Sequence, residues 1–168
     1  MSRTTESFDP YALVTALEGR RVVYVLIGGF ARIIRGTEEV TDGIDVVPSA
    51  KPENLRRLDL ALTDLGAHLG NGTPAALDSP VPTLLELRTG VGELKVIPEP
   101  AGTRGGYDDL RRAATREPIG RGLRPTVASI GDLARMLAAR GREKDQLPLQ
   151  QLRTLSEFER RLGRGLDR

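Results

Sequence analysis

The sequence contains no cysteine, no tryptophan and only one histidine, and 4% of its 168 residues are aromatic. Without cysteine the chain can form neither a disulfide nor a thiolate metal site, so nothing in it requires an oxidising compartment. No apolar stretch approaches the ~20 residues of a membrane-spanning helix, and the first residues lack the apolar core of a signal peptide. These absences predict a cytoplasmic protein that does not associate with a membrane.

Hydrophobic residues make up 39% of the chain and charged residues 29%, and the formal net charge is +2. This composition is sufficient for one compact domain, or for a small domain with a helical appendage. Arginines are concentrated in residues 111–124 and 135–168. Such a distribution suits a polyanionic partner, and it equally suits a solvated, arginine-rich surface.

Helical and extended patterns alternate along the chain, which predicts an α/β protein. Asp9 followed by Pro10, and later Ser129, are typical of helix N-termini. Residues 89–92 are turn-forming and separate two extended runs, which predicts a β-hairpin. The expected helices cover residues 10–19, a short segment after Gly29, 52–65, 107–114, 129–140 and the chain from about Leu147, and the expected strands cover 22–27, 41–47, 83–88, 93–97 and 124–128.

We expect residues 1–128 to form the main domain and residues 129–168 to form a C-terminal helical segment. The last helix carries apolar residues at spacings that bring them onto one side: Leu152, Leu155, Phe158, Leu162 and Leu166. A stripe of this kind more often packs on its own domain than on a partner, so the segment is expected to pack on residues 1–128.

The most informative segment is the β-branched run 22–27 followed by Gly28 and Gly29. A strand that meets a glycine pair and then a helix places backbone N–H groups where the phosphates of a nucleotide could bind. The next expected strand carries Asp45, a possible metal ligand. Gly43 occupies the position two residues earlier, where a second carboxylate on the same face would be expected for a two-metal site.

Six segments of this chain occur in a characteristic order: 27–31, 41–47, 52–55, 92–97, 127–133 and 141–145. Together they contain the glycine pair, the acidic strand, a Pro-Glu-Asn-Leu helix start and a late Gly-Arg-Glu-Lys-Asp sequence. The ordered set resembles the AbiEii-type and MenT-type nucleotidyltransferases, bacterial toxin components within the DNA polymerase beta-like superfamily. The resemblance covers most of the chain.

This resemblance implies a nucleotidyltransferase fold with a small mixed sheet flanked by helices. It also implies that a nucleoside triphosphate binds at the glycine pair, that carboxylates hold Mg²⁺, and that a nucleotidyl group is transferred to a hydroxyl. Mg²⁺ suits this role because it takes oxygen ligands and neutralises phosphate charge. In the MenT-type toxins the acceptor is a tRNA 3′ end, and an antitoxin is usually encoded beside such toxins.

The candidate catalytic and metal-binding residues are Asp45 and Asp42, the latter only if a bulge at Gly43 turns it toward the site. The candidate nucleotide-binding residues are Gly28, Gly29, Thr41, Lys95, Lys144 and Asp145. Asp145 also suits an ordinary helix cap, which is the interpretation we favour.

Four positions depart from the pattern that the resemblance implies. Gly43 and Lys95 stand where aspartates are expected, Glu39 stands where an arginine is expected, and Leu137 stands where a lysine is expected. These departures predict that catalysis is impaired or lost. The alternative function is a non-catalytic module that binds a nucleotide, an RNA or a partner protein.

Lys95 itself admits two interpretations. Its ammonium could bind phosphate directly as a point charge, or it could pair with Asp45 and fill the former metal site. We favour the ion pair, because opposite charges on adjacent strands commonly neutralise each other.

Overall fold

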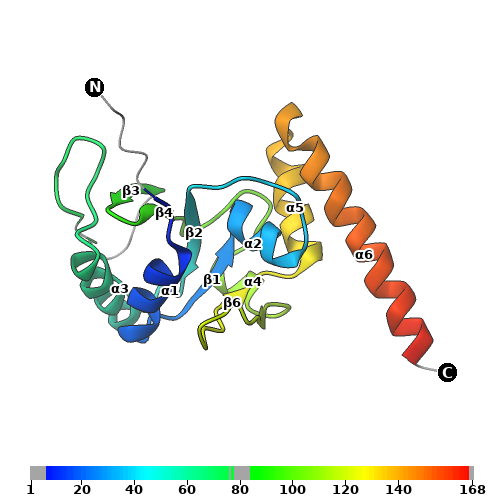
Figure 1. The fold of residues 1–168 in the computed structure, drawn as a ribbon, viewed down its shortest axis with the longest axis horizontal. Helices are drawn as coiled ribbons and strands as arrows, with labels where there is room; N and C mark the ends of the chain where they lie inside the picture. The colour runs from blue at the N-terminus through cyan, green and yellow to red at the C-terminus, as the bar shows by residue number, and fades with distance from the viewer. Residues whose placement is uncertain (1–6, 76, 78–83, 167–168) are drawn as a thin grey trace.

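The structure is a computed structural model that describes residues 7–75, 77 and 84–166. Its described part contains a six-stranded sheet in the order β3-β4-β2-β1-β6-β5 (Figure 1). The strands are β1 (Tyr24–Ile27), β2 (Gly43–Pro48), β3 (Leu85–Thr89), β4 (Gly92–Val96), β5 (Thr115–Arg116) and β6 (Thr126–Val127). The sheet is mixed, because β2 pairs with β4 and β1 with β6 in parallel, whereas the other neighbours are antiparallel. The predicted α/β class with a small mixed sheet is confirmed.

The helices follow the predicted order. They are α1 (Pro10–Gly19), α2 (Gly28–Arg35), α3 (Pro52–Asp64), α4 (Tyr107–Leu110), α5 (Ile130–Arg140) and α6 (Gln146–Leu166), with a short 3₁₀ helix η1 (Glu143–Asp145) before α6. The carboxylate of Asp9 accepts a hydrogen bond from the Ala12 N–H at 3.1 Å, and the Ser129 hydroxyl accepts one from the Asp132 N–H at 3.0 Å. Both predicted caps therefore begin their helices.

The core lies between the sheet and the helices that pack on it. Alternate residues of the central strands, such as Ile44 and Val46 on β2 and Leu94 on β4, are fully or almost fully buried, together with Leu13 of α1 and Leu58 of α3. Because side chains alternate across a strand, residues between these buried positions face the other side of the sheet. Asp45 and Lys95 are two such residues.

Among the residues whose side chains the structure describes, helix α6 buries its apolar residues in its first half. Leu149 and Leu152 are buried beside α5, whereas Phe158 is 59% and Leu162 is 55% exposed. The helix extends away from the sheet toward the C-terminus (Figure 1). The expectation that the whole apolar stripe packs on the domain is therefore wrong for Phe158 and Leu162, because the helix continues beyond the surface it could cover; the side chain of Leu166 lies outside the described residues.

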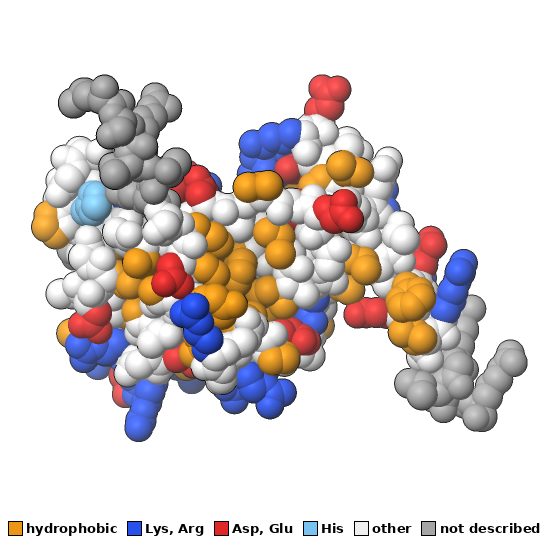
Figure 2. All heavy atoms as spheres, in the orientation of Figure 1, with side chains coloured by type: hydrophobic (Ala, Val, Ile, Leu, Met, Phe, Trp, Pro, Cys, Tyr) orange, Lys and Arg blue, Asp and Glu red, His pale blue; other side chains and the backbone are white. Residues whose placement is uncertain are grey.

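No helix in the described part of the chain is both long and apolar enough to span a membrane. On the face of the molecule drawn in Figure 2, hydrophobic side chains gather near the centre, and charged side chains lie mainly around the margin.

Candidate functional site

Two adjoining cavities lie beside Asp45 and share Arg32, Asp45, Lys95, Arg140 and Arg142 in their walls. One has a volume of about 370 Å³ and reaches the apolar side chains of α5. The other has a volume of about 280 Å³ and reaches the segment that leads into β2. We call the two cavities together the Asp45 cleft.

The cleft brings together most of the predicted site residues. The 280 Å³ cavity is lined by Gly29, Thr41, Asp42, Gly43, Asp45, Lys95 and Lys144, among others, and Gly28 lines the larger cavity. Asp145 lies outside both linings. The predicted site residues other than Asp145 therefore line adjoining cavities, although they come from segments separated by more than a hundred residues of sequence. Their role in binding a nucleotide stays a prediction.

The strand pairing forms a row of charges across the floor of this cleft. Asp45 on β2 is in register with Lys95 on β4, and Lys95 is in register with Glu86 on β3. All three side chains point to the same face of the sheet, because their strand neighbours are buried in the core on the other face. Lys95 therefore lies between two acidic positions.

Asp45 also lies against the start of α2. A Cβ on Gly28 would overlap the Asp45 carboxylate, and Gly28 has a positive φ of 75°, so only glycine suits this position. Ile27, which precedes the helix, contributes no side-chain cap to the N–H groups of the first turn, and Gly28 and Gly29 of that turn line the cleft. The close approach found at Gly28 is to Asp45, and the predicted role of the glycine pair in binding phosphates stays a prediction.

Gly43 has no room for the carboxylate that a two-metal site would need. A Cβ on Gly43 would overlap the carbonyl oxygen of Glu93 and lie 2.7 Å from the Glu93 Cβ. The pairing of β2 with β4 continues without interruption from Gly43 through Val46. The bulge that we considered at Gly43 is therefore absent, and the position is closed by the neighbouring strand.

Asp42 lines the cleft without a bulge at Gly43. It precedes β2, its side chain is exposed, and its carbonyl accepts a hydrogen bond from the Glu93 N–H at 3.0 Å. Asp42 is one of the residues that line the 280 Å³ cavity, as is Asp45. Even so, no group of three His, Cys, Asp or Glu side chains suited to a metal ion occurs among the residues that the structure describes.

The expected ion pair between Asp45 and Lys95 is not formed. Among the described residues, no salt bridge involves either side chain, although their backbones are neighbours in the sheet. Burial raises the pKa of Asp45 above its ordinary value, and the positive charges of Lys95, Arg32 and Arg140 only partly oppose this effect. The Lys95 ammonium thus remains available within the described part of the cleft.

Two of the cleft arginines are held by carboxylates. The buried Arg32 of α2 pairs with Glu39 at 2.8 Å, so the acidic residue found where an arginine was expected compensates a buried arginine. Arg142 pairs with Asp145 at 2.8 Å. The carboxylate of Asp145 accepts hydrogen bonds from two nitrogens of Arg142, so Asp145 positions an arginine, and the favoured interpretation of a plain helix cap does not describe it.

The pKa values of these groups reflect their surroundings. Burial of Asp145 opposes its ionisation, but hydrogen bonds from Arg142 and the charges of Arg142, Arg140 and Arg32 hold its pKa below the ordinary value. Partial burial, with the positive charge of Arg142 nearby, lowers the pKa of Arg140. The walls of the cleft carry as many carboxylates as cations, so its positive side chains stand among negative ones. The cations are Arg32, Lys95, Arg140, Arg142 and Lys144, and the carboxylates are Glu39, Asp42, Asp45, Glu86 and Glu93.

One wall of the larger cavity is apolar. Leu133, Met136 and Leu137 of α5 line it together with Ile97 and Pro100. Leu137 is almost completely buried, so the position where a lysine was expected contributes packing and no charge. The cleft thus has an apolar side and a cationic side.

Sequence reasoning missed three of the cationic residues, Arg32, Arg140 and Arg142. Arg32 follows the glycine pair by one helical turn, and this spacing would have placed it near the start of α2. Arg140 and Arg142 flank Gly141, which ends α5 with a positive φ of 60°. Only the packing of α5 beside α2 brings them to Asp45, and no local sequence signal reports that packing.

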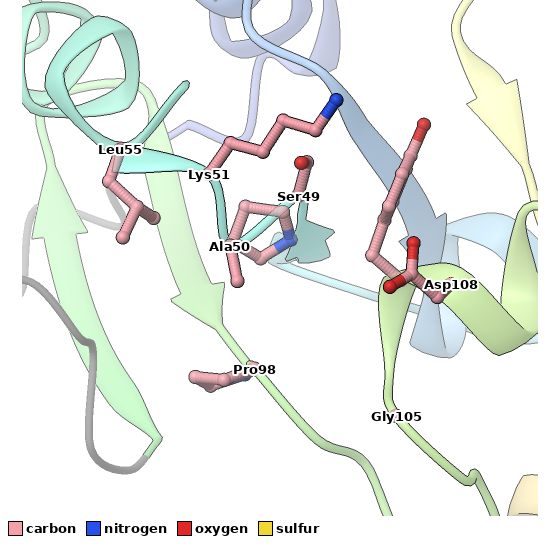
Figure 3. Close-up of a pocket in the computed structure, with 9 residues that line it drawn as sticks. Ser49, Ala50, Lys51, Leu55, Pro98, Gly105 and Asp108 are labelled. Atoms are coloured by element: carbon pink, nitrogen blue, oxygen red, sulfur yellow. The ribbon is translucent and has the colours of Figure 1, made fainter. Parts of the chain in front are cut away.

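A further cavity of about 190 Å³ lies at the other end of β2 and is drawn in Figure 3. Ser49 and Lys51, which follow β2, and Asp108 of α4 contribute its polar groups, and Leu55 and Pro98 contribute apolar ones. It contains none of the predicted site residues. Within the described part of the chain, the predicted residues that line a cavity thus lie in the Asp45 cleft.

The cleft residues do not fit a two-metal site. Such a site needs several carboxylates converging on one point. Here Gly43 is closed by β4, Lys95 stands beside Asp45, and no group of three His, Cys, Asp or Glu side chains in the described part of the chain could hold a metal ion.

Comparison with solved structures identifies the fold. The chain is similar to the lincosamide antibiotic adenylyltransferase LnuA in its lincomycin-bound crystal structure, with a TM-score of 0.60, 17% identity, and coverage of 89% of this chain and 99% of that one. It is also similar to the solution structure of the antibiotic-resistance factor ANT(2'')-Ia, with a TM-score of 0.55, 16% identity, and coverage of 94% and 92%. No protein-family model matches the chain, and no curated protein sequence matches it significantly.

These similarities show that the chain has a nucleotidyltransferase fold, as predicted. At such low identity they carry the fold alone. The predicted relationship to the AbiEii-type and MenT-type toxins is a finer statement than the fold and stays a prediction.

Proposed function

We propose that this protein is a nucleotidyltransferase-fold binding module in which metal-dependent nucleotidyl transfer is impaired or lost. The ligand that we assign to the Asp45 cleft is a nucleotide or a closely related phosphate ester. The observation that carries the proposal is the closure of Gly43 by β4, because it excludes a carboxylate at the position where a second metal ligand would stand. The cytoplasmic location favoured by the composition suits such a ligand.

The two sides of the cleft support a nucleotide over a simple anion. Arg32, Lys95, Arg140 and Arg142 offer positive charge for phosphate groups. Met136 and its apolar neighbours on α5 offer a surface for a base or another flat, apolar group. The first turn of α2 adds backbone N–H groups to the cationic side.

The resemblance to the AbiEii-type and MenT-type toxins supplies further candidates for the partners. On that basis tRNA is the macromolecule to test as acceptor or ligand, and a cognate antitoxin is the protein partner to seek. The lincosamide antibiotic adenylyltransferase LnuA suggests a second acceptor class, small molecules with hydroxyl groups.

The proposal is tested by incubating the protein with each of the four labelled nucleoside triphosphates, Mg²⁺ and total tRNA, while binding of the same nucleotides is measured by calorimetry. We expect binding without transfer of label. Transfer that depends on Mg²⁺ and disappears in Asp45→Ala would overturn the loss of catalysis. Absence of binding for every nucleotide would overturn the binding module.

A weakly active transferase is the second candidate, and one observation favours it. Asp42 and Asp45 line the same 280 Å³ cavity, so two carboxylates are available without a bulge. If they held Mg²⁺, it would neutralise phosphate charge there. In this case Asp42→Asn and Asp45→Asn would each abolish a slow transfer that wild-type protein performs, and nucleotide binding would require Mg²⁺.

A further inference from the structure

We infer that the Asp45 cleft binds the phosphate groups of its ligand without a divalent metal ion, and that the ammonium of Lys95 supplies the central positive charge. This inference rests on the proposed function and specifies how that site recognises its ligand. It follows from the disagreement between the cleft residues and a metal site.

Lys95 lies at the centre of the cleft floor. It stands in the middle of the row formed with Asp45 and Glu86, on the face of the sheet that forms the floor of the cleft. Its side chain lines both cavities and is only partly exposed. A cation between two acidic strand positions occupies the kind of place that a metal ion takes between carboxylates.

Two of the cleft cations, Lys95 and Arg140, have no carboxylate partner among the described residues. Among the described residues, neither Lys95 nor Arg140 forms a salt bridge, whereas Arg32 and Arg142 are each held by a carboxylate. Lys95 and Arg140 can therefore direct N–H groups at a ligand without first breaking an ion pair with a described residue. Arg32 and Arg142 are oriented by Glu39 and Asp145 and add charge from the sides.

The charges around Asp45 favour a phosphate group over a divalent metal ion. Burial already raises the pKa of Asp45, so its ionised form is disfavoured even with Lys95, Arg32 and Arg140 nearby. No group of three His, Cys, Asp or Glu side chains among the described residues could hold a metal ion, and the cations near Asp45 repel a divalent ion. The same cations attract a triphosphate most strongly when no Mg²⁺ neutralises it.

The test is calorimetric titration of the full chain with ATP, with tripolyphosphate and with adenosine, each in EDTA and in excess Mg²⁺. We expect ATP to bind in EDTA and Mg²⁺ to weaken its binding. ATP binding tighter than tripolyphosphate assigns a nucleotide to the cleft; equal binding of the two overturns the nucleotide and leaves a polyphosphate. ATP binding only in Mg²⁺ overturns the metal-free inference but leaves the binding module intact, whereas no binding in either buffer removes both.

Variants connect the result to Lys95. Lys95→Ala is expected to weaken ATP binding in EDTA by roughly tenfold or more, the usual effect of losing a charge-assisted contact. Lys51→Ala is the matched control, because Lys51 is an exposed lysine in the separate 190 Å³ cavity. Thermal melting of both variants reports whether they fold. A folded Lys95→Ala protein with unchanged affinity in EDTA would overturn the role of Lys95.

Discussion

The Cβ of Glu93 fills the space that a side chain on Gly43 would need, at 2.7 Å from the Cβ that such a side chain would begin with. The Glu93 carbonyl oxygen lies closer still, and it belongs to the backbone of β4, which cannot move without disturbing the parallel pairing with β2. The missing carboxylate is therefore a consequence of strand packing in this protein as well as of residue identity.

Restoring an acidic residue at this position is expected to damage the fold. Gly43→Asp should lower the free energy of unfolding by about 3 kcal/mol, because the new side chain overlaps backbone atoms. Denaturant unfolding followed by circular dichroism measures the loss. Gly70→Asp serves as the control, since a Cβ on Gly70 meets nothing within 4 Å; equal, small effects for both variants would show that β4 yields easily at Gly43.

Asp45 is expected to destabilise the protein at neutral pH. Its pKa is raised in the folded state, so its contribution to stability is present at low pH, where it is protonated, and is lost as the pH rises through the folded pKa. Asp45→Asn should therefore raise the melting temperature at pH 7, and the gain should shrink as the pH falls through the carboxyl range. Melting curves from pH 3 to pH 8 test this; a variant that is less stable than wild type at pH 7 would contradict the raised pKa.

The pair of Arg32 and Glu39 is expected to be coupled strongly. Both side chains are largely buried, so removing Glu39 leaves Arg32 without its partner. A double-mutant cycle with Arg32→Ala and Glu39→Ala should give a coupling energy of about 2 kcal/mol. The exposed pair Arg57 and Glu53 on α3 is the comparison and should give about 0.5 kcal/mol or less. Similar values for the two pairs would remove the structural role that we assign to Glu39.

The two halves of α6 are expected to differ in their contribution to stability. Leu152 is fully buried against α5, so Leu152→Ala should cost about 3 kcal/mol. Phe158 is mostly exposed, so Phe158→Ala should change stability by less than about 0.5 kcal/mol. Chemical denaturation of both variants provides the comparison, and a large loss for Phe158→Ala would mean that the outer half of α6 is packed in solution.

The sequence was informative where local chemistry determines local structure. Asp9 and Ser129 mark helix starts by their capping hydrogen bonds, and the glycine pair marks the turn from β1 into α2. Each of these signals acts over three or four residues, which is why it can be recognised without the fold.

Local signals of this kind do not reveal which distant segments pack together. The two-residue strand β5 was not predicted, because its residues show no extended pattern of their own and are defined by pairing with β6. Arg140 and Arg142 lie near Asp45 because α5 packs beside α2. The closure at Gly43 likewise depends on the close approach of β4, which residue type alone does not reveal.

The most direct measurement is titration of the protein with Mn²⁺, a paramagnetic substitute for Mg²⁺, followed by electron paramagnetic resonance. Wild-type protein is expected to bind no stoichiometric Mn²⁺, with or without ATP, because Lys95 stands beside Asp45 in the sheet. Lys95→Asp would place two carboxylates side by side on β2 and β4 and is expected to create a Mn²⁺ site. One Mn²⁺ bound to wild-type protein and lost in Asp45→Asn would contradict the replacement of the metal ion by Lys95.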